Sequence, residues 1–311
     1  MELIRHLHNL RPRHRGCVAT IGAFDGVHIG HRAVIDRLLQ KSAELELPSV
    51  VIVFEPLPRE YFSPLNAPAR LTSFREKFEA FEALGVGRIL RIGFTKQLQT
   101  MSAQDFIEAI FVHGLGVSHV VLGDDFRFGN DRQGDFDLLS AQGERFGFDV
   151  EPTATCLVGG QRVSSTRIRE ALGLADFELA QDLLGRPFGI SGKVVYGRQL
   201  GRTLGFPTAN LELHRLRSPL SGVYAVEVSG AGLDNALGVA NVGTRPTVNE
   251  SIKANLEVHL LNRSMDLYGK RIEVVFRHKL REEQKFDTID ELKENIARDV
   301  QQAQSWFEMR V

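Results

Sequence analysis

The sequence is poor in cysteine and tryptophan, with two cysteines and one tryptophan among 311 residues. Two cysteines cannot build the disulfide framework that stabilises a small secreted domain. Cys17 and Cys156 both stand in apolar, strand-like contexts, so we predict that they act as small core residues.

Long hydrophobic runs are also missing. No apolar run reaches the length needed to span a bilayer, and the basic, polar N-terminus has no hydrophobic signal core. These absences predict a cytoplasmic protein that does not associate with a membrane.

Charge of neither sign is in excess. The 38 Lys and Arg residues nearly balance the 39 Asp and Glu residues, which gives a net charge of −1. There is thus no global electrostatic basis for binding nucleic acid. Arg11, Arg13 and Arg15 cluster near the start, where a solvated surface is the favoured interpretation. A length of 311 residues favours two domains.

Apolar and amphipathic runs alternate from Cys17 to about Leu184. The expected strands are Cys17–Ile21, Val50–Phe54, Arg88–Ile92 and His119–Leu122. The expected helices are Ala33–Leu45, Phe74–Leu84 and Ala103–His113. Strands that alternate with helices predict βαβ units and a parallel sheet, which binds ligands at the carboxyl ends of its strands.

Three polar loops follow expected strands. The stretch Gly22–His31 holds three glycines, one carboxylate and two histidines, and it leads into an expected helix near Gly30. The free backbone N–H groups at the start of that helix would point toward the same place as the two imidazoles. Such a set of donors is suited to binding a nucleotide phosphate. Glu55–Arg59 and Gly123–Gly129 follow other strands, so we expect all three loops to converge on one edge of the sheet.

A later segment, Val163–Leu172, also suits phosphate oxygens. Ser164 or Ser165 can cap a helix, with Arg169 one turn in. Taken alone, however, the segment is better explained as an ordinary N-cap with surface arginines.

The predicted site has no obvious protein nucleophile, since no serine lies in a Gly-x-Ser-x-Gly frame and no lysine in a Walker-type loop. Direct attack of one substrate on a nucleoside triphosphate needs only positioning and charge stabilisation. His28 and His31 can donate to the attacked phosphate, and Ser164, Thr166 and Arg169 can hold the leaving pyrophosphate. Metal ligation by the two histidines is disfavoured, because no nearby Cys or His supplies the remaining zinc ligands.

The pattern changes near Gly185, where we place the boundary between domains 1–184 and 185–311. Short apolar runs separated by Gly, Asn and Pro predict an antiparallel barrel or sandwich. The expected strands are Val194–Tyr196, Val223–Val228, Ala236–Val242, Leu256–Leu260 and Arg271–Phe276. A final helix should begin at Thr288, in a capping box with Glu291, and pack on the strands. Its expected apolar stripe is Ile289, Leu292, Ile296, Val300 and Phe307.

A glycine-rich segment opens this second half. Its backbone N–H groups could wrap nucleotide phosphates. Its glycines are Gly192, Gly197, Gly201 and Gly205. Thr208 and Asn210 alternate along the chain, so both can present oxygens to one Mg²⁺ ion. Downstream, Glu257 is either a surface residue of a strand or a general base, and periodicity alone favours the surface.

The first half resembles the adenylyltransferase part of bacterial bifunctional FAD synthetases. The resemblance rests on Gly22–His31, Gly123–Gly129 and Ser164–Arg169 in this order; His28-x-x-His31 alone marks only the wider nucleotidylyltransferase superfamily. It implies a Rossmann-like nucleotidylyltransferase domain in which the FMN phosphate attacks the ATP α-phosphate. The implied ATP-binding residues, besides His28 and His31, are Gly22, Phe24, Asp25, Gly30, Ser164, Ser165, Thr166 and Arg169. The implied FMN-side loop comprises Asp125, Phe126, Arg127 and Phe128.

The second half resembles bacterial riboflavin kinase, an antiparallel β-barrel with a C-terminal helix. The matching segments are Gly205–Asn210, Gly222–Tyr224, Asn241–Thr247, Glu257–His259 and Leu267–Gly269. The resemblance implies that Glu257 is the base, that Thr208 and Asn210 bind Mg²⁺, and that Arg281 and Glu282 lie near the flavin. The implied ATP-binding residues are Gly192, Gly197, Gly201, Arg202, Gly205, Thr208 and Asn210.

The two resemblances together cover roughly residues 15 to 308. They imply that riboflavin and ATP give FMN, and that FMN and a second ATP give FAD and pyrophosphate. The expected partners are small molecules, and transient self-association or delivery of FAD to apo-flavoproteins is compatible with this function. A single active half beside a flavin-binding or oligomerising module is the alternative, and a flavin-sensing regulator is disfavoured because no DNA-binding helix-turn-helix or basic stripe is present.

Overall fold

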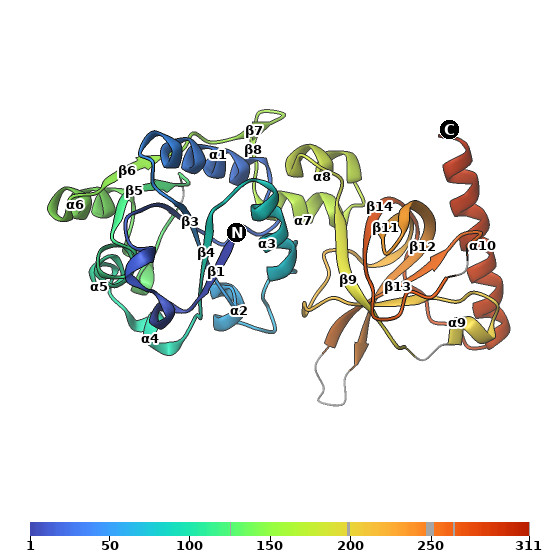
Figure 1. The fold of residues 1–311 in the computed structure, drawn as a ribbon. Coiled ribbons are helices and arrows are strands. Elements are labelled where there is room, and N and C mark those ends of the chain that lie inside the picture. The colour runs from blue at the N-terminus through green and yellow to red at the C-terminus, as the bar shows by residue number, and fades with distance from the viewer. Residues whose placement is uncertain (125, 198–199, 247–251, 264, 311) are drawn as a thin grey trace. The chain divides into compact units, whose positions relative to one another are not determined.

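The chain folds into two compact units in a computed structural model, which describes all residues except 125, 198–199, 247–251, 264 and 311 (Figure 1). The first unit comprises Met1–Pro68 and Phe74–Ser164, and the second comprises Ala69–Ser73 and Ser165–Val311. The predicted domain boundary at residue 184/185 stays a prediction.

The first unit is built on a parallel sheet of six strands in the order β1-β4-β3-β2-β5-β6. Its strands are β1 (Glu2–Arg5), β2 (Cys17–Ile21), β3 (Ser49–Phe54), β4 (Arg88–Ile92), β5 (Val117–Leu122) and β6 (Asp149–Pro152). Because β3, β2 and β5 are neighbours, the loops that follow them leave the same edge side by side. The predicted convergence of the three loops is therefore confirmed.

Successive side chains of each strand point to opposite faces of the sheet, and they contribute to two separate hydrophobic cores, one on each face. Val18, Val51 and Val121 pack with α1 and α3 on one face. Their neighbours Ala19 and Val120 pack on the other face with α5, the π-helical segment that follows it, and α6. The helices are α1 (Ile29–Glu44), α2 (Pro58–Phe62), α3 (Phe74–Ala83), α4 (Lys96–Thr100), α5 (Ala103–Phe106), the π-helical segment (Ile107–Leu115) and α6 (Phe136–Phe146).

The second unit is a closed six-stranded barrel in the order β10-β13-β12-β11-β14-β9, and every neighbouring pair in it is antiparallel. Its strands are β9 (Gly189–Val195), β10 (Ala209–Glu212), β11 (Gly222–Gly230), β12 (Leu233–Pro246), β13 (Ile252–Leu260) and β14 (Arg271–Arg281). Its helices are α7 (Ser165–Gly173), α8 (Phe177–Leu184), α9 (Leu200–Thr203) and α10 (Ile289–Glu308). The predicted barrel and C-terminal helix are confirmed.

Helix α10 packs on the outside of the barrel, as predicted. Thr288 caps it by accepting a hydrogen bond from the Glu291 N–H. Ala303 and Phe307 bury themselves against Val223 and Ala225 of β11. The first residue of the predicted stripe, Ile289, is instead 61% exposed, because the helix meets the barrel through its second half.

Two local predictions were wrong. The strand predicted to reach Tyr196 ends at Val195, and the Tyr196 ring is 73% exposed and stacks on Tyr268 at 4.0 Å. Cys17 is fully buried as predicted, but Cys156 lies outside any strand and is only half-buried.

No helix in the described part of the chain is long and apolar enough to cross a membrane.

Candidate active sites

The two histidines of the Gly22–His31 loop sit together at the start of α1. His28 caps this helix, since its Nδ1 accepts a hydrogen bond from the His31 backbone N–H at 3.2 Å. The two rings stack with centroids 3.5 Å apart and an angle of 15° between their planes. Because Nδ1 of His28 is the acceptor, a neutral His28 ring carries its proton on Nε2 and can donate it to a ligand.

The loop in front of the histidines is strained. Phe24 and Val27 adopt φ angles of 47° and 42°, in the left-handed region that costs an L-residue about 1–2 kcal/mol. The edge of Phe24 supports the His31 ring at 5.1 Å. Space is tight at the glycines on both sides: a Cβ at Gly22 would lie 3.0 Å from the Phe24 ring, and one at Gly30 would lie 3.3 Å from His28.

The His31 ring is held neutral. Burial lowers the pKa of His31 well below its usual range, and the nearby His28 and Lys77 lower it further. Its Nδ1 is shielded from solvent and has no hydrogen-bond partner among the described residues. A buried nitrogen without a partner beside a helix N-terminus is suited to a ligand oxygen, as the sequence predicts for a phosphate.

This depressed pKa makes stability depend on pH. Near pH 6.5 the unfolded His31 takes up a proton, while the folded ring stays neutral until the pH reaches its lower pKa. We therefore expect the free energy of unfolding to fall below pH 6.5, by up to about 1.4 kcal/mol per pH unit from this group. Urea unfolding at several pH values measures the slope, and His31→Gln should flatten it. The exposed His8→Gln is the matched control, and equal slopes in all three proteins would contradict the expectation.

The loop after β5 carries the predicted FMN-side residues. Asp125 lies outside the described residues. Phe126 and Phe128 stack at 5.6 Å, and Phe128 is buried against the core. Arg127 instead points to Asp135, with its Nη1 2.5 Å from the carboxylate. Phe128 is thus mainly a packing residue, and the described charged groups of this loop are Arg127 and Asp124, whose carboxylate pairs with Arg162.

Sequence reasoning missed an aromatic cluster at the same sheet edge. Tyr61 and Phe62 lie in α2, which follows β3, and both rings contact Phe94, at 5.2 and 5.5 Å. Phe62 is 58% exposed, so part of its ring is open to a ligand. The sequence could have indicated this cluster, because Tyr61 and Phe62 stand just after the predicted loop Glu55–Arg59 at the sheet edge.

The predicted pyrophosphate-binding segment forms the start of α7. The helix begins at Ser165, directly after Ser164, so both serines stand where the sequence predicts a cap. Thr166 is exposed, whereas the Nε of Arg169 donates to the Ala69 carbonyl at 2.6 Å. These residues from Ser165 onward belong to the second compact unit, and their role in binding phosphate stays a prediction.

The second site lies on the outer face of the barrel. The register places Glu257 of β13 between Asn210 of β10 and Asn241 of β12. Leu256 and Val258 point to the barrel interior and are buried, so Glu257 points the other way. Its Oε1 accepts a hydrogen bond from Nδ2 of Asn255 at 2.9 Å.

The amide of Asn210 is buried under the glycine-rich segment. A Cβ at Gly197 would lie 2.5 Å from this amide, so only glycine fits there. The Asn210 Oδ1 has no hydrogen-bond partner among the described residues, although the residue is 7% exposed. Thr208 stands two residues before Asn210, and a Cβ at position 201 would lie 3.4 Å from its Oγ1. The register places Asn210 beside Glu257, and the predicted pairing of Thr208 with Asn210 stays a prediction.

Other predicted kinase residues have structural partners. Gly192 is buried within β9, where a Cβ would meet the Glu212 carbonyl at 2.9 Å, so strand packing alone requires glycine.

Arg281 donates to Asp299 of α10 through Nε and Nη2, both at 2.8 Å. Glu282 is exposed and accepts from Lys279. Arg202 is exposed in α9, and Gly205, with a φ of 90°, ends the turn after it.

A second carboxylate, missed by sequence reasoning, stands on the same face of the barrel. Glu283 lies so close to Gly243 that a Cβ there would collide with its Oε1. Gly243 is the cross-strand neighbour of Asn255. The contact between Glu283 and β12 could not be predicted from the sequence, because Glu283 follows β14 in the chain and only the fold brings it to β12.

Known proteins match both halves of the chain. A family profile described as FAD synthetase matches residues 10–167, and one described as riboflavin kinase matches residues 184–307. A bifunctional riboflavin kinase/FMN adenylyltransferase from Pseudomonas fluorescens is 53% identical and covers 98% of this chain and 97% of its own length. The protein of the same name from Escherichia coli K12 is 51% identical, with 99% and 98% covered.

A solved structure has the same fold. It is described as a macrolide-efflux protein from Streptococcus pneumoniae, and it is 28% identical with a TM-score of 0.78. The match covers 98% of this chain and 100% of that one. The relatives and the two profiles agree along the whole length, and the chain belongs to the family of bifunctional riboflavin kinase/FMN adenylyltransferases.

Proposed function

We propose that the chain catalyses two consecutive transfers: riboflavin and ATP give FMN, and FMN and a second ATP give FAD and pyrophosphate. The observation that supports this best is the presence of two separate polar sites, each in the half that matches the corresponding family. Incubation of the purified protein with riboflavin, ATP and Mg²⁺, followed by separation of the products, is the test. Absence of both FMN and FAD would overturn the proposal.

The alternative, with one active half, is not favoured. It would require one of the two residue sets to be incomplete, yet both His28/His31 and Asn210/Glu257 are placed side by side. FMN without FAD in the product assay would leave only the kinase half active.

In the adenylyl transfer, the FMN phosphate oxygen attacks the α-phosphorus of ATP, and pyrophosphate leaves. The two imidazoles would donate to the α-phosphate as its charge grows, which is the step that electrostatic stabilisation accelerates most. Neutral His31 and the Nε2–H of His28 suit this role, because hydrogen bonding needs no change of protonation state. Ser164, Ser165, Thr166 and Arg169 remain our candidates for the pyrophosphate.

The cluster of Tyr61, Phe62 and Phe94 is our candidate for the ring system of FMN. A flat, apolar ring stacks favourably on exposed aromatic side chains. The cluster follows β3, next to β2 and the histidine loop, so a flavin bound there would lie at the same sheet edge as the histidines proposed to bind the α-phosphate that FMN attacks.

In the phosphoryl transfer, Glu257 would accept the proton of the riboflavin 5′-hydroxyl as this oxygen attacks the γ-phosphate of ATP. Such carboxylates mainly orient the attacking hydroxyl. The hydrogen bond from Asn255 fixes the position of one Glu257 oxygen.

The residues present fit a Mg²⁺ ion, although no group of three or more His, Cys, Asp or Glu in the described ranges could hold a metal. The unpaired Oδ1 of Asn210 and the hydroxyl of Thr208 are hard oxygen donors of the kind Mg²⁺ prefers. When bound, the ion would neutralise charge on the ATP phosphates.

Asn210→Leu tests this assignment. We expect FMN formation to fall about 10²-fold, because the buried amide oxygen is lost, and the Mg²⁺ concentration for half-maximal rate to rise. Rates measured across a Mg²⁺ titration give both values. FAD formation from supplied FMN is the internal control and should be unchanged. An unaltered Mg²⁺ requirement in this variant would refute the assignment.

Self-association and delivery of FAD to apo-flavoproteins rest on the family's function alone, and a cytoplasmic location stays a prediction.

A further inference from the structure

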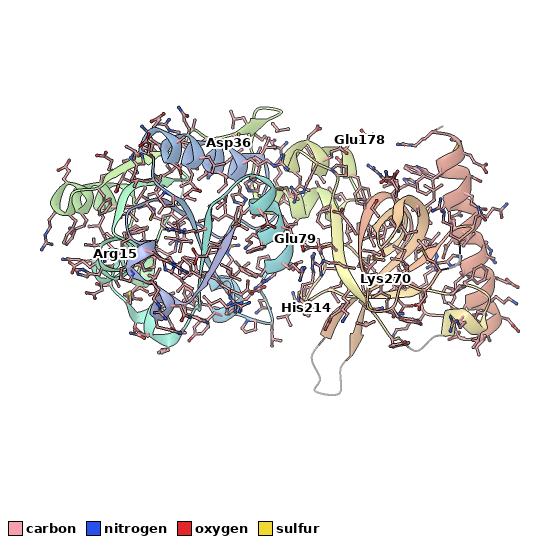
Figure 2. The ribbon with its side chains drawn as sticks, in the orientation of Figure 1. Arg15, Asp36, Glu79, Glu178, His214 and Lys270 are labelled. Carbon is pink, nitrogen blue, oxygen red and sulfur yellow. The ribbon has the colours of Figure 1, made fainter. Side chains whose placement is uncertain are left out.

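Lys77 is a buried lysine that the reaction outlined above does not use. It lies in α3, where its residue is 1% exposed. Its helix neighbours Arg75 and Glu79 pair with each other at 2.8 Å on the exposed side, where Figure 2 labels Glu79. Lysine is almost never fully buried unless it is paired, so the contacts of its ammonium group decide what this residue does.

The ammonium group of Lys77 reaches the histidine loop. Its Nζ donates to the carbonyl oxygen of Ala23 at 2.5 Å. Ala23 stands between Gly22 and the strained Phe24, where the backbone turns into the left-handed region. A strained loop keeps its shape only where its surroundings hold it, and this contact holds the carbonyl directly before the strain.

The charge of Lys77 also reaches the site. Together with burial and His28, it lowers the pKa of His31. Since its Nζ sits at the Ala23 carbonyl of the histidine loop, the same charge would attract an anion bound at this loop. Weak screening in a buried setting makes such an effect larger than at the surface.

We propose that Lys77 is a positioning residue of the adenylyltransferase site: it fixes the loop through Ala23 and places a buried positive charge near His31 that favours the negatively charged phosphates of ATP. This inference rests on the proposed role of the histidine loop in adenylyl transfer. It explains why a lysine occupies a stripe of α3 whose other members, Phe74, Phe78 and Phe81, are apolar.

Two substitutions separate the charge from the hydrogen bond. Lys77→Met keeps the apolar stem and loses both, whereas Lys77→Gln keeps an N–H donor and loses only the charge. We expect kcat for FAD formation to fall about 10–100-fold in Lys77→Met, with a raised KM for ATP and an unchanged KM for FMN. Lys77→Gln should melt like the wild type yet recover only part of the rate.

The control is Arg75→Met, on the exposed side of the same helix, which should form FAD at the wild-type rate. FMN formation by the kinase half of each variant reports whether the protein is intact. In both Lys77 variants the pKa of His31, followed by NMR, should rise, which a merely structural role would not cause in a folded Lys77→Gln. If Lys77→Met fails to fold, Lys77→Gln decides the question alone.

Wild-type rates of FAD formation in Lys77→Gln, or an unshifted His31 pKa, would overturn the inference while leaving the proposed function intact. Absence of FAD formation in the wild-type protein would instead overturn the proposed function itself.

Discussion

Replacement of Glu257 by alanine is expected to abolish FMN formation from riboflavin while FAD formation from supplied FMN continues at the wild-type rate. A positioned general base contributes about 10²–10⁴-fold to the rate of proton transfer, and the barrel has a single candidate carboxylate between Asn210 and Asn241 in the described register. The fold should survive, because Glu257 lies on the outer face and only half-buried. The two rates are measured separately by supplying either riboflavin or FMN.

Two further variants sharpen this test. Glu257→Gln keeps the size and the contact to Asn255 but cannot accept a proton, so it should be nearly as inactive as the alanine variant. Glu227→Gln removes another barrel carboxylate, one that pairs with Arg277 at 2.7 Å, and should leave both reactions intact. A folded Glu257 variant that lost both activities would contradict the two-site assignment, and one that kept FMN formation would exclude Glu257 as the base.

Strands buried on both faces were predicted well from sequence. Cys17–Ile21, in which all residues are buried, was predicted to the residue, because a short apolar run between a glycine and a glycine-rich loop leaves little choice. The same holds for Arg88–Ile92, where two arginines flank the buried Ile89 and Leu90. The edge strands β1 and β6 were missed, since Glu2–Arg5 and Asp149–Pro152 carry charges and are too short to show a pattern. Their pairing depends on β4 and β5, which are far away in sequence.

Helix type was harder to predict than helix position. The amphipathic run Ala103–His113 is helical as expected, but only Ala103–Phe106 is α-helical and the rest is a π-helical segment. Helix α1 starts at Ile29, close to the start expected near Gly30 but four residues before the amphipathic run Ala33–Leu45, because the His28 side chain caps it. Apolar periodicity cannot show a cap supplied by histidine.

The candidate sites were predictable where residues cluster in sequence and not where the fold assembles them. His28 and His31 share a ten-residue motif, so their proximity follows from the sequence. Asn210 and Asn241 flank Glu257 only through strand pairing, and Glu283 reaches Gly243 of β12 only through the turn after β14. The sequence alone could have drawn attention to Lys77. It stands four residues before Phe81 on the apolar stripe of an expected helix, a position where a lysine interrupts the apolar pattern.

Replacement of both His28 and His31 by alanine is expected to have the opposite effect to the Glu257 variant, abolishing FAD formation while FMN still accumulates. Removing one preorganised donor to a developing charge typically costs about 10²–10³-fold, and this variant removes two that stack 3.5 Å apart. The readout is the FMN to FAD ratio with riboflavin as the starting substrate. The exposed His113→Ala is the matched control and should give the wild-type ratio.

Loss of the cap must be separated from loss of the donors. His28 caps α1, and loss of an N-cap costs about 1 kcal/mol, a modest part of the roughly 5–15 kcal/mol that stabilises a domain. His28→Asn keeps a side-chain acceptor for the His31 N–H but withdraws the Nε2–H donor from the ligand. If the imidazole itself stabilises the attacked phosphate, His28→Asn stays folded and fails to form FAD. If it makes FAD as fast as the wild type, the histidine serves only as a cap, and the anion is bound by the helix start alone.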